Sequence, residues 1–376
     1  MNYEPEIENG TEEKPKKLNR LPRFAIAFYI SAGVSLLLFL GFLLSEPFAD
    51  LFNKYVSSVF RAFMARLTGW IPFSLAEFFV IMLPIIVVVA SGYAMKRYSD
   101  SWRDVWIYCG TALSLLALFF SLFTIGFAPA YRGSRVDKKL GMQRADVSAE
   151  ELYETALLLS EAVNREVGNV IFAENGASVM PYGYEQMNEE LLLAYDKAYD
   201  KYDFLQRLDS PLKRVMLSGL MSYTHITGVY TFFTGEANIN VDFPDYTLPY
   251  TAAHELAHQR GIAREDEANF MAFLVCIDSD DPYLRYSAYL NLYEYVSSAL
   301  YSSDQDLYFK ARETLASDVK GEMAAYSAFY EKYRDSVASE VSETVNNTFL
   351  VIQGTEGTKS YGMVVDLAVA YYKTEK

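Results

Sequence analysis

The stretch HELAHQRGIAREDEAN, residues 254–269, decides how the C-terminal part of this chain folds and which ligands it can offer. It holds two of the three histidines of the 376-residue sequence, His254 and His258. Their four-residue spacing places both imidazoles on one face of a helix, one turn apart. Two imidazoles so placed can share one zinc ion. Glu255 projects about 100° around the helix from His254, so it can serve as general base for a water that the metal activates.

The residues after the second histidine predict a turn and a second helix. Gly261 can adopt the left-handed conformation that ends a helix, and helical periodicity resumes near Ala263. A third ligand has to come from the acidic start of this second helix. The helix-face geometry favours Glu265, keeps Glu267 as the alternative ligand and ranks Asp266 last. The competing interpretation of the whole stretch is two exposed helix histidines beside a glutamate.

Three long apolar runs near the N-terminus, residues 24–46, 73–95 and 105–127, each have the length of a membrane-spanning helix. The first run is too long for the core of a cleavable signal peptide, and no small-residue cleavage site follows it. We therefore predict a membrane domain over residues 21–127, preceded by a disordered cytoplasmic tail at residues 1–20.

The basic residues near the ends of these spans indicate the orientation of the chain. The N-terminal tail carries five of them, and the loop between the second and third spans carries Lys96, Arg97 and Arg103. The loop between the first two spans has only three, spread along an amphipathic stretch. This distribution predicts a multi-pass protein of the cytoplasmic membrane with residues 128–376 on the extracytoplasmic side. The basic residues just after the third span count against this orientation; they are Arg132, Arg135, Lys138 and Lys139.

The C-terminal segment is predicted to be mostly helical. Ser148 and Glu151 have the spacing of a capping box and open a helix that runs to about residue 165. A second helical pattern covers residues 184–207. Ser210 followed by Pro211 is the N-terminal signal of a third helix, which we expect to end near residue 222.

One part of this segment has a strand pattern instead. Residues 228–243 are rich in β-branched and aromatic residues and are interrupted by Gly235, which predicts a hairpin or one exposed strand. Residues 237–243, ANINVDF, are either an edge strand that pairs with an extended substrate backbone or an internal strand of the hairpin. In the first case Asn238 lies near the substrate cleft.

Four further side chains are candidates for substrate binding or for stabilising an oxyanion. Tyr223, Tyr230 and Tyr361 can donate a phenolic hydrogen bond to the negative oxygen of a tetrahedral intermediate. His225 is the histidine outside the HExxH motif. We expect a structural or surface role for His225 rather than an oxyanion role, because no spacing to another motif supports the latter.

The pairing of HExxH with the pattern ExxA(D/N) on a second helix resembles the gluzincin metallopeptidases. The zinc ligands that this resemblance implies are His254, His258 and Glu265. It also implies that Glu255 is the base and that Asn269 orients a ligand histidine. Asparagine replaces the commoner aspartate at this position, so the side chain that orients the histidine is neutral. The short gap before Glu265 is closer to the glycine turn of metzincins and keeps Glu267 open as a ligand.

A wider resemblance covers most of the chain. The three spans and four later segments are similar to a family of uncharacterised bacterial membrane proteins with a zincin domain. Those segments are TGVYTFFTGEANIN at 227–240, LPYTAAHELAHQRG at 248–261, REDEANF at 264–270 and SYGMVVDL at 360–367. The fold expected from it is mainly α, with three N-terminal transmembrane helices and a mostly helical, zincin-like α+β domain at residues 128–376 that carries a small edge strand or hairpin. The resemblance implies no particular substrate.

These observations predict a membrane-anchored, zinc-dependent hydrolase, a metallopeptidase that uses one Zn²⁺ ion, with Glu255 as general base. Its partners are the lipid bilayer, through three spans, and a peptide or protein substrate. The formal net charge of −15, concentrated after the third span, argues against nucleic acid as a partner. The alternative is a zinc-binding extracytoplasmic sensor or assembly module without turnover.

Overall fold

The computed structural model describes residues 20–98 and 101–374. The predicted tail at residues 1–20 therefore lies outside the described residues, except for Arg20. The chain forms two compact units, which are described separately. The first contains the residues up to Val34 together with Val80–Ser121, and the second contains Ser35–Phe79 together with the chain from Leu122 onward.

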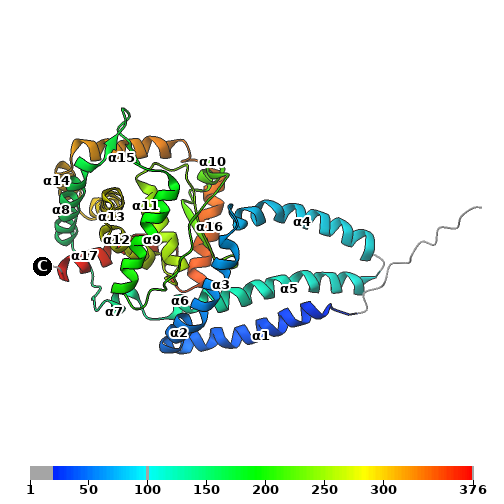
Figure 1. The fold of residues 1–376 in the computed structure, drawn as a ribbon. Helices are drawn as coiled ribbons and strands as arrows, with labels where there is room; N and C mark the ends of the chain where they lie inside the picture. Colours follow the sequence, from blue (N-terminus) through cyan, green and yellow to red (C-terminus); the bar gives the residue numbers. More distant parts are fainter. Residues whose placement is uncertain (1–19, 99–100, 375–376) are drawn as a thin grey trace, which may run out of the picture. The chain divides into compact units, whose positions relative to one another are not determined.

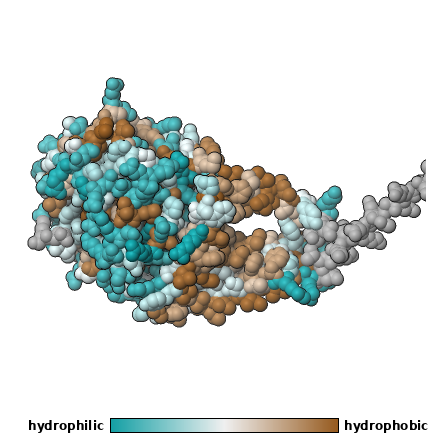
Figure 2. Space-filling model, viewed as in Figure 1, coloured by the Kyte–Doolittle hydropathy of each residue, from teal (hydrophilic) through white to brown (hydrophobic). Residues whose placement is uncertain are grey.

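Three helices of the described chain are long and apolar enough to cross a membrane, as the sequence predicts: α1 (Arg23–Leu44), α4 (Leu75–Tyr98) and α5 (Trp102–Gly126). Few residues of these helices are buried by protein. Their surface is hydrophobic, whereas the visible face of the second unit is mainly hydrophilic (Figure 2). In that respect the three helices are typical of segments whose side chains face lipid.

The chain between the first two spans belongs to the second unit, and its residues 46–69 form one helical stretch. It consists of α2 (Glu46–Phe52), the π-helical turn η1 (Asn53–Ser57) and α3 (Ser58–Gly69). Ser45 caps α2 by accepting the Phe48 N–H on its hydroxyl. After the third span come two short helices, α6 (Ala128–Arg132) and α7 (Val136–Lys139).

The remaining helices build the body of the second unit (Figure 1). The longer ones are α8 (Ala149–Glu166), α9 (Tyr184–Lys201), α11 (Thr247–Gln259), α12 (Glu265–Ile277), α13 (Pro282–Ser303), α14 (Gln305–Glu313), α15 (Ser317–Glu331), α16 (Val337–Ile352) and α17 (Val364–Thr374). The short turns are α10 (Ser218–Met221), η2 (Val167–Asn169), η3 (Ser222–Thr224) and η4 (Gly357–Met363).

The core lies around α11, α12 and α13, which pack on one another. Every residue of α12 from Glu265 to Cys276 is buried, so this helix is enclosed on all sides. Helix α13 also packs against α8, which lies toward the outside of the unit together with α14 and α15 (Figure 1). This packing holds the two helices of the 254–269 stretch rigidly side by side.

Two of the predicted helices have the expected starts. Ser148 and Glu151 form the complete capping box of α8, with both side-chain hydrogen bonds present. Helix α9 begins at Tyr184 as expected but ends at Lys201, six residues earlier than predicted.

The helix predicted from Ser210-Pro211 is wrong. The segment contains the short strand β3 (Lys213–Arg214) and only later the single turn α10. Tertiary contacts outweigh the local capping signal here. Lys213 pairs in parallel with Asn238 of the neighbouring strand, and the Leu212 N–H donates to the Asn188 side chain.

The predicted hairpin is confirmed. Strands β4 (Gly228–Thr231) and β5 (Glu236–Ile239) are antiparallel, and Gly235 makes the turn with a φ of 70°. The sheet order is β3-β5-β4, so β5 is the central strand and the interpretation of residues 237–243 as an edge strand is wrong. The edge beside the histidine helix is β4. A separate two-stranded sheet pairs β1 (Ile171–Phe172) with β2 (Ser178–Val179).

Candidate metal centre

Three ligand groups of the 254–269 stretch meet where α11 and α12 face each other. Nε2 of His254 lies 3.1 Å from Oε2 of Glu265, and Nε2 of His258 lies 3.3 Å from the same oxygen. All three side chains are buried. Gly261, with a φ of 92°, turns the chain back between the two helices and brings Glu265 onto the histidine face.

These separations fit a single zinc ion. Two ligand atoms that each lie about 2.0–2.1 Å from a tetrahedral zinc ion are about 3.3 Å apart. The two nitrogen–oxygen distances agree with that value, and two imidazoles with one carboxylate form a common catalytic zinc set that leaves a fourth position open.

The Nδ1 atoms of both imidazoles already have hydrogen-bond partners. Nδ1 of His258 lies 2.7 Å from the Ile262 carbonyl, which can only accept, so this nitrogen carries a proton. Nδ1 of His254 lies 2.7 Å from Oδ1 of Asn269, whose amide nitrogen in turn faces the Tyr361 carbonyl. In the neutral imidazoles both Nε2 lone pairs therefore point at the Glu265 carboxylate. Such an arrangement requires a cation or protons between the groups.

The pKa shifts of His258 and Glu265 also favour positive charge between the histidines and the carboxylate. Burial lowers the pKa of His258, but the charge and hydrogen bond of Glu265 outweigh it and raise that pKa to about 9. For Glu265, burial raises the pKa, whereas the two histidines lower it to a net value well below the usual range of a carboxyl group. The site is thus built to hold positive charge against a buried carboxylate.

Glu255 lies beside this cluster under strand β4. Its carboxyl group is buried, and Oε2 has no hydrogen-bond partner among the described residues. Burial raises its pKa to about 7, although His254 and His258 act in the opposite direction. A Cβ atom at Gly228 would lie only 2.6 Å from Cγ of Glu255, so glycine at this strand position makes room for the carboxylate.

Two tyrosines lie near the cluster of His254, His258 and Glu265. The Tyr361 ring, from η4, stacks on His254 with centroids 6.4 Å apart, and burial together with Glu265 and Glu255 raises the pKa of its hydroxyl. Tyr131 of α6 is buried, and the charge of Glu265 adds to burial in raising the pKa of its hydroxyl. Sequence reasoning missed Tyr131, because nothing in its spacing links the end of the third span to the HExxH helix.

The other acidic residues of α12 point elsewhere. Glu267 accepts the Val136 N–H, and Asp266 pairs with Arg144 and Arg135 at 2.6 and 3.0 Å. The structure therefore brings Glu265 to the histidines and does not bring Glu267 or Asp266 there.

Of the remaining sequence candidates, Tyr230 contacts Glu255, and the other three have other partners. Tyr223 is 43% exposed and packs on Tyr333. His225 lies between the Tyr330 hydroxyl and the Tyr333 carbonyl, at 2.9 and 2.8 Å. Asn238 donates to the Val229 and Glu236 carbonyls inside the hairpin. Tyr230 lies beside the site: its backbone N–H donates to Glu255, and its ring lies 5.1 Å from that of Phe127, which is 6.0 Å from the His258 ring.

Comparison with known proteins identifies one relationship. A family model described as "Protein of unknown function (DUF3810)" matches residues 52–369, which include α3, the last two spans and the whole candidate metal centre. No match to this chain was found among curated proteins or among solved structures.

Proposed function

The chain belongs to the DUF3810 family of unknown function, and we propose that it is a membrane-anchored, zinc-dependent hydrolase that cleaves peptide bonds. One observation carries the proposal. A single buried carboxylate oxygen lies within 3.3 Å of the Nε2 atoms of two histidines whose other nitrogens are already engaged. His254, His258 and Glu265 would hold the ion, which would supply a Lewis acid for the carbonyl and for the attacking water.

Glu255 is the group that moves the proton. It lies next to the ligand cluster, it is buried, and its Oε2 atom has no other partner among the described residues. A carboxyl group whose pKa lies near neutrality can take a proton from water and return it to a leaving amine. Gly228 keeps the space that this exchange needs.

Tyr361 and Tyr131 are the candidates for stabilising the oxyanion. Burial and nearby carboxylates raise the pKa of both hydroxyls, so both stay protonated and can donate a hydrogen bond. Among the residues predicted for this role, Tyr361 is the one that stacks on a ligand histidine.

Strand β4 favours a peptide over other hydrolysable substrates. It is an edge strand of its sheet and runs beside Glu255. The outward backbone groups of an edge strand can pair with an extended polypeptide. A peptide added there would pass the general base.

Three of the four basic residues after the third span, which argue against an extracytoplasmic domain, have acidic partners in the same unit. Arg135 pairs with Asp266, Lys138 with Glu46 and Lys139 with Asp50, at 3.0, 2.6 and 3.2 Å. The orientation rule counts Lys and Arg near the span ends and not the net charge, so these residues still weigh against an extracytoplasmic domain. Our proposal that the domain lies outside the cytoplasmic membrane therefore rests on the Lys and Arg residues of the N-terminal tail and of the loop between the second and third spans.

The experiment uses the full chain in nanodiscs, because Ser35–Phe79 belong to the same compact unit as the candidate site. We expect about one zinc ion per chain in the wild type and in Glu255→Gln, and loss of zinc in His254→Ala. Chelator-sensitive hydrolysis of a peptide library should appear with the wild type only. Hydrolysis by Glu255→Gln at the wild-type rate would refute the assigned role.

A zinc-binding sensor or assembly module is the second candidate, and one contact favours it. The Glu236 carboxylate of β5 accepts the Leu75 and Ala76 N–H groups at the start of α4, and it also pairs with Lys213. The sheet beside the metal centre is thus tied directly to the start of a span. Zinc-dependent changes at Leu75 together with no hydrolysis of the library would favour this role.

A further inference from the structure

The helical segment α2–η1–α3 has its polarity reversed relative to a surface helix of a soluble domain. Its outward residues recur every four positions along the helix, and each is more than half exposed. They are Leu51, Tyr55, Val59, Phe63 and Leu67, continued by Trp70. We call this row the apolar stripe. A surface helix normally turns such a stripe toward the core.

The opposite face of the segment carries its polar groups and is buried against the rest of the unit. Arg61 is almost fully buried and donates to the Gly126 carbonyl and to the Asn53 and Gln206 side chains. About two turns further on, the Thr68 hydroxyl donates to the Thr234 carbonyl. The segment is therefore held by hydrogen bonds on its inner face, while its apolar face is left open.

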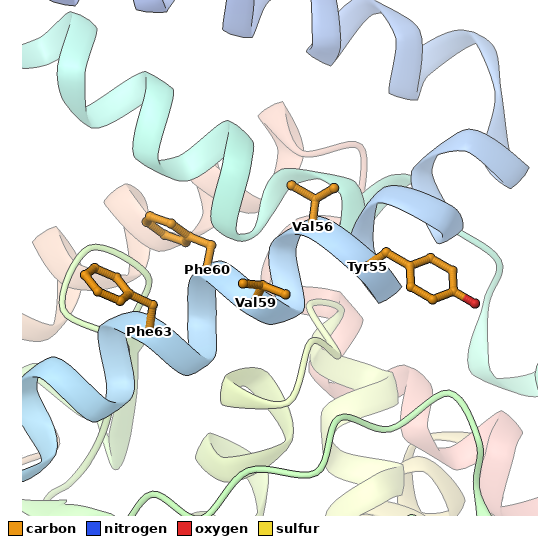
Figure 3. Close-up of a pocket in the computed structure, with 5 residues that line it drawn as sticks. All are labelled: Tyr55, Val56, Val59, Phe60 and Phe63. Atoms are coloured by element: carbon orange, nitrogen blue, oxygen red, sulfur yellow. The ribbon is translucent and has the colours of Figure 1, made fainter.

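Figure 3 shows how the open face is shaped. The side chains of Tyr55, Val56, Val59, Phe60 and Phe63 come from one continuous helical stretch and line an open, almost purely apolar hollow. Leaving this many apolar side chains in water costs about 25 cal/mol for each Å² of surface. An exposed contiguous apolar patch of this kind marks a surface that binds a partner or a membrane.

The chain connections identify the bilayer as the partner. Helix α2 starts two residues after the end of α1, and Phe42 of α1 packs on Phe48 and Phe52 at 5.4 and 5.0 Å. At the other end, five residues separate Gly69 from the start of α4, a link of at most about 18 Å. Both ends of the segment are therefore held at the ends of membrane spans.

The composition of the segment fits the water–lipid boundary. Tyr55 and Trp70 are aromatic residues of the kind enriched at that depth, and the exposed Lys54 and Arg66 can reach lipid headgroups. A helix with an apolar face and flanking basic residues typically lies in the plane of the interface.

We propose that α2, η1 and α3 lie in the membrane interface with the apolar stripe inserted among the lipid chains. The inner face of the same segment holds the turn between the zinc ligands. The Asn53 amide donates to the Gly261 carbonyl, and a Cβ atom on Gly261 would overlap the Arg61 guanidinium. Since a helix with its side chains is about 10–12 Å across, the ligand turn lies only about that far behind the lipid-facing side.

This placement names the substrate class, and that part rests on the proposed hydrolase function. A centre held so close to the bilayer acts on polypeptide segments that are themselves attached to the membrane, next to a span or a lipid anchor. Soluble peptides reach it only by diffusion in three dimensions, whereas anchored ones are concentrated at its surface.

The lipid contact is tested without any turnover. In full-length protein with Cys109→Ala, a fluorescent label is placed at Val59→Cys or at Leu193→Cys of α9, two positions with 66% and 60% exposure. Cys276 is buried and stays unlabelled. In nanodiscs whose lipids carry a spin label in the upper acyl chain, we expect several-fold stronger quenching at 59 than at 193.

Equal quenching at 59 and 193, while a label at Leu37→Cys in α1 is quenched, would overturn the lipid contact. Disulfide formation between two chains through Cys at position 59, without lipid quenching, would assign the stripe to a second copy and overturn it as well. The Leu37 position is 70% exposed on a span and shows that the spin labels are within reach.

The substrate class is tested with one cleavable peptide sequence, either free or joined to a lipid anchor in the same nanodisc. We expect faster cleavage of the anchored form, and a loss of that advantage in Val59→Glu with zinc content unchanged. Equal rates for both forms would overturn the substrate class and leave the hydrolase intact. If neither form is cleaved, the proposed hydrolase function is wrong. The lipid contact is then judged by quenching alone.

Discussion

Nδ1 of His254 donates to Oδ1 of Asn269 over 2.7 Å, and this contact sets the tautomer of a candidate zinc ligand. The asparagine amide nitrogen faces the Tyr361 carbonyl at 3.3 Å. An aspartate could accept from the histidine but could not donate to that carbonyl. The asparagine thus links the orientation of His254 to the position of η4, which carries Tyr361 over the site.

Replacing Asn269 with leucine should weaken zinc binding by about 10–100-fold, because the ligand histidine loses its orienting acceptor. Competition with a chromophoric chelator measures the affinity. Asn291→Leu in α13, which removes a hydrogen bond to the Ser287 carbonyl away from the site, is the matched control. Equal affinities of Asn269→Leu and wild type would show that the contact does not orient the ligand.

Two neighbouring glutamates of α12 should respond differently to the same change. Glu265→Gln removes the carboxylate shared by both histidines and should abolish zinc retention through dialysis. Glu267→Gln should retain zinc, since Glu267 accepts the Val136 N–H instead. Metal analysis of the dialysed full-length variants distinguishes them. Zinc lost from Glu267→Gln and kept in Glu265→Gln would reverse the ligand assignment.

Gly228→Ala should reduce peptide hydrolysis strongly while zinc content stays the same. The added Cβ would lie 2.6 Å from Cγ and Oε1 of Glu255, so the general base has to move. Gly219→Ala, where the nearest atom is 3.9 Å away, is the control and should keep its activity. The rate of hydrolysis per bound zinc is the quantity to compare. Equal rates in both variants would show that a Cβ at position 228 does not displace Glu255.

Glu294 in α13 should make stability fall with rising pH. Burial raises its pKa from 4.5 to about 7, against the lowering effect of the Tyr246 hydrogen bond. Between these two values the folded state binds more protons than the unfolded state, so the free energy of unfolding decreases as pH rises through 7. The loss is at most about 3 kcal/mol at pH 8.

Glu294→Gln removes this titration and keeps an acceptor for the Tyr246 hydroxyl. We expect melting temperatures equal to wild type near pH 4, below the unfolded pKa, and higher than wild type at pH 8, in full-length protein. Glu189→Gln, at an exposed position of α9, should follow the wild type at both pH values. A variant that melts below wild type at pH 8 would show that the ionised carboxylate stabilises the core.

Local patterns determined a large part of this molecule. The three apolar runs have the length of spans because hydrophobic thickness sets helix length, and they are observed at α1, α4 and α5. The capping box at Ser148 and the turn at Gly235 depend on a few adjacent residues, so each could be recognised without the fold. The spacing of His254, Glu255 and His258 is a property of one helix and needs no other element.

Only the tertiary structure decided what depends on contacts between distant segments. It placed Glu265, and not Glu267, against the two histidines, because α12 is enclosed on all sides and local periodicity could not say which side faces α11. It made a strand at Lys213, where pairing with β5 outweighs the helix signal. It also brought Tyr131 within electrostatic reach of Glu265 and turned the apolar face of α3 outward. A side chain's neighbours across the fold are set by packing, and helix periodicity describes only the neighbours along its own helix.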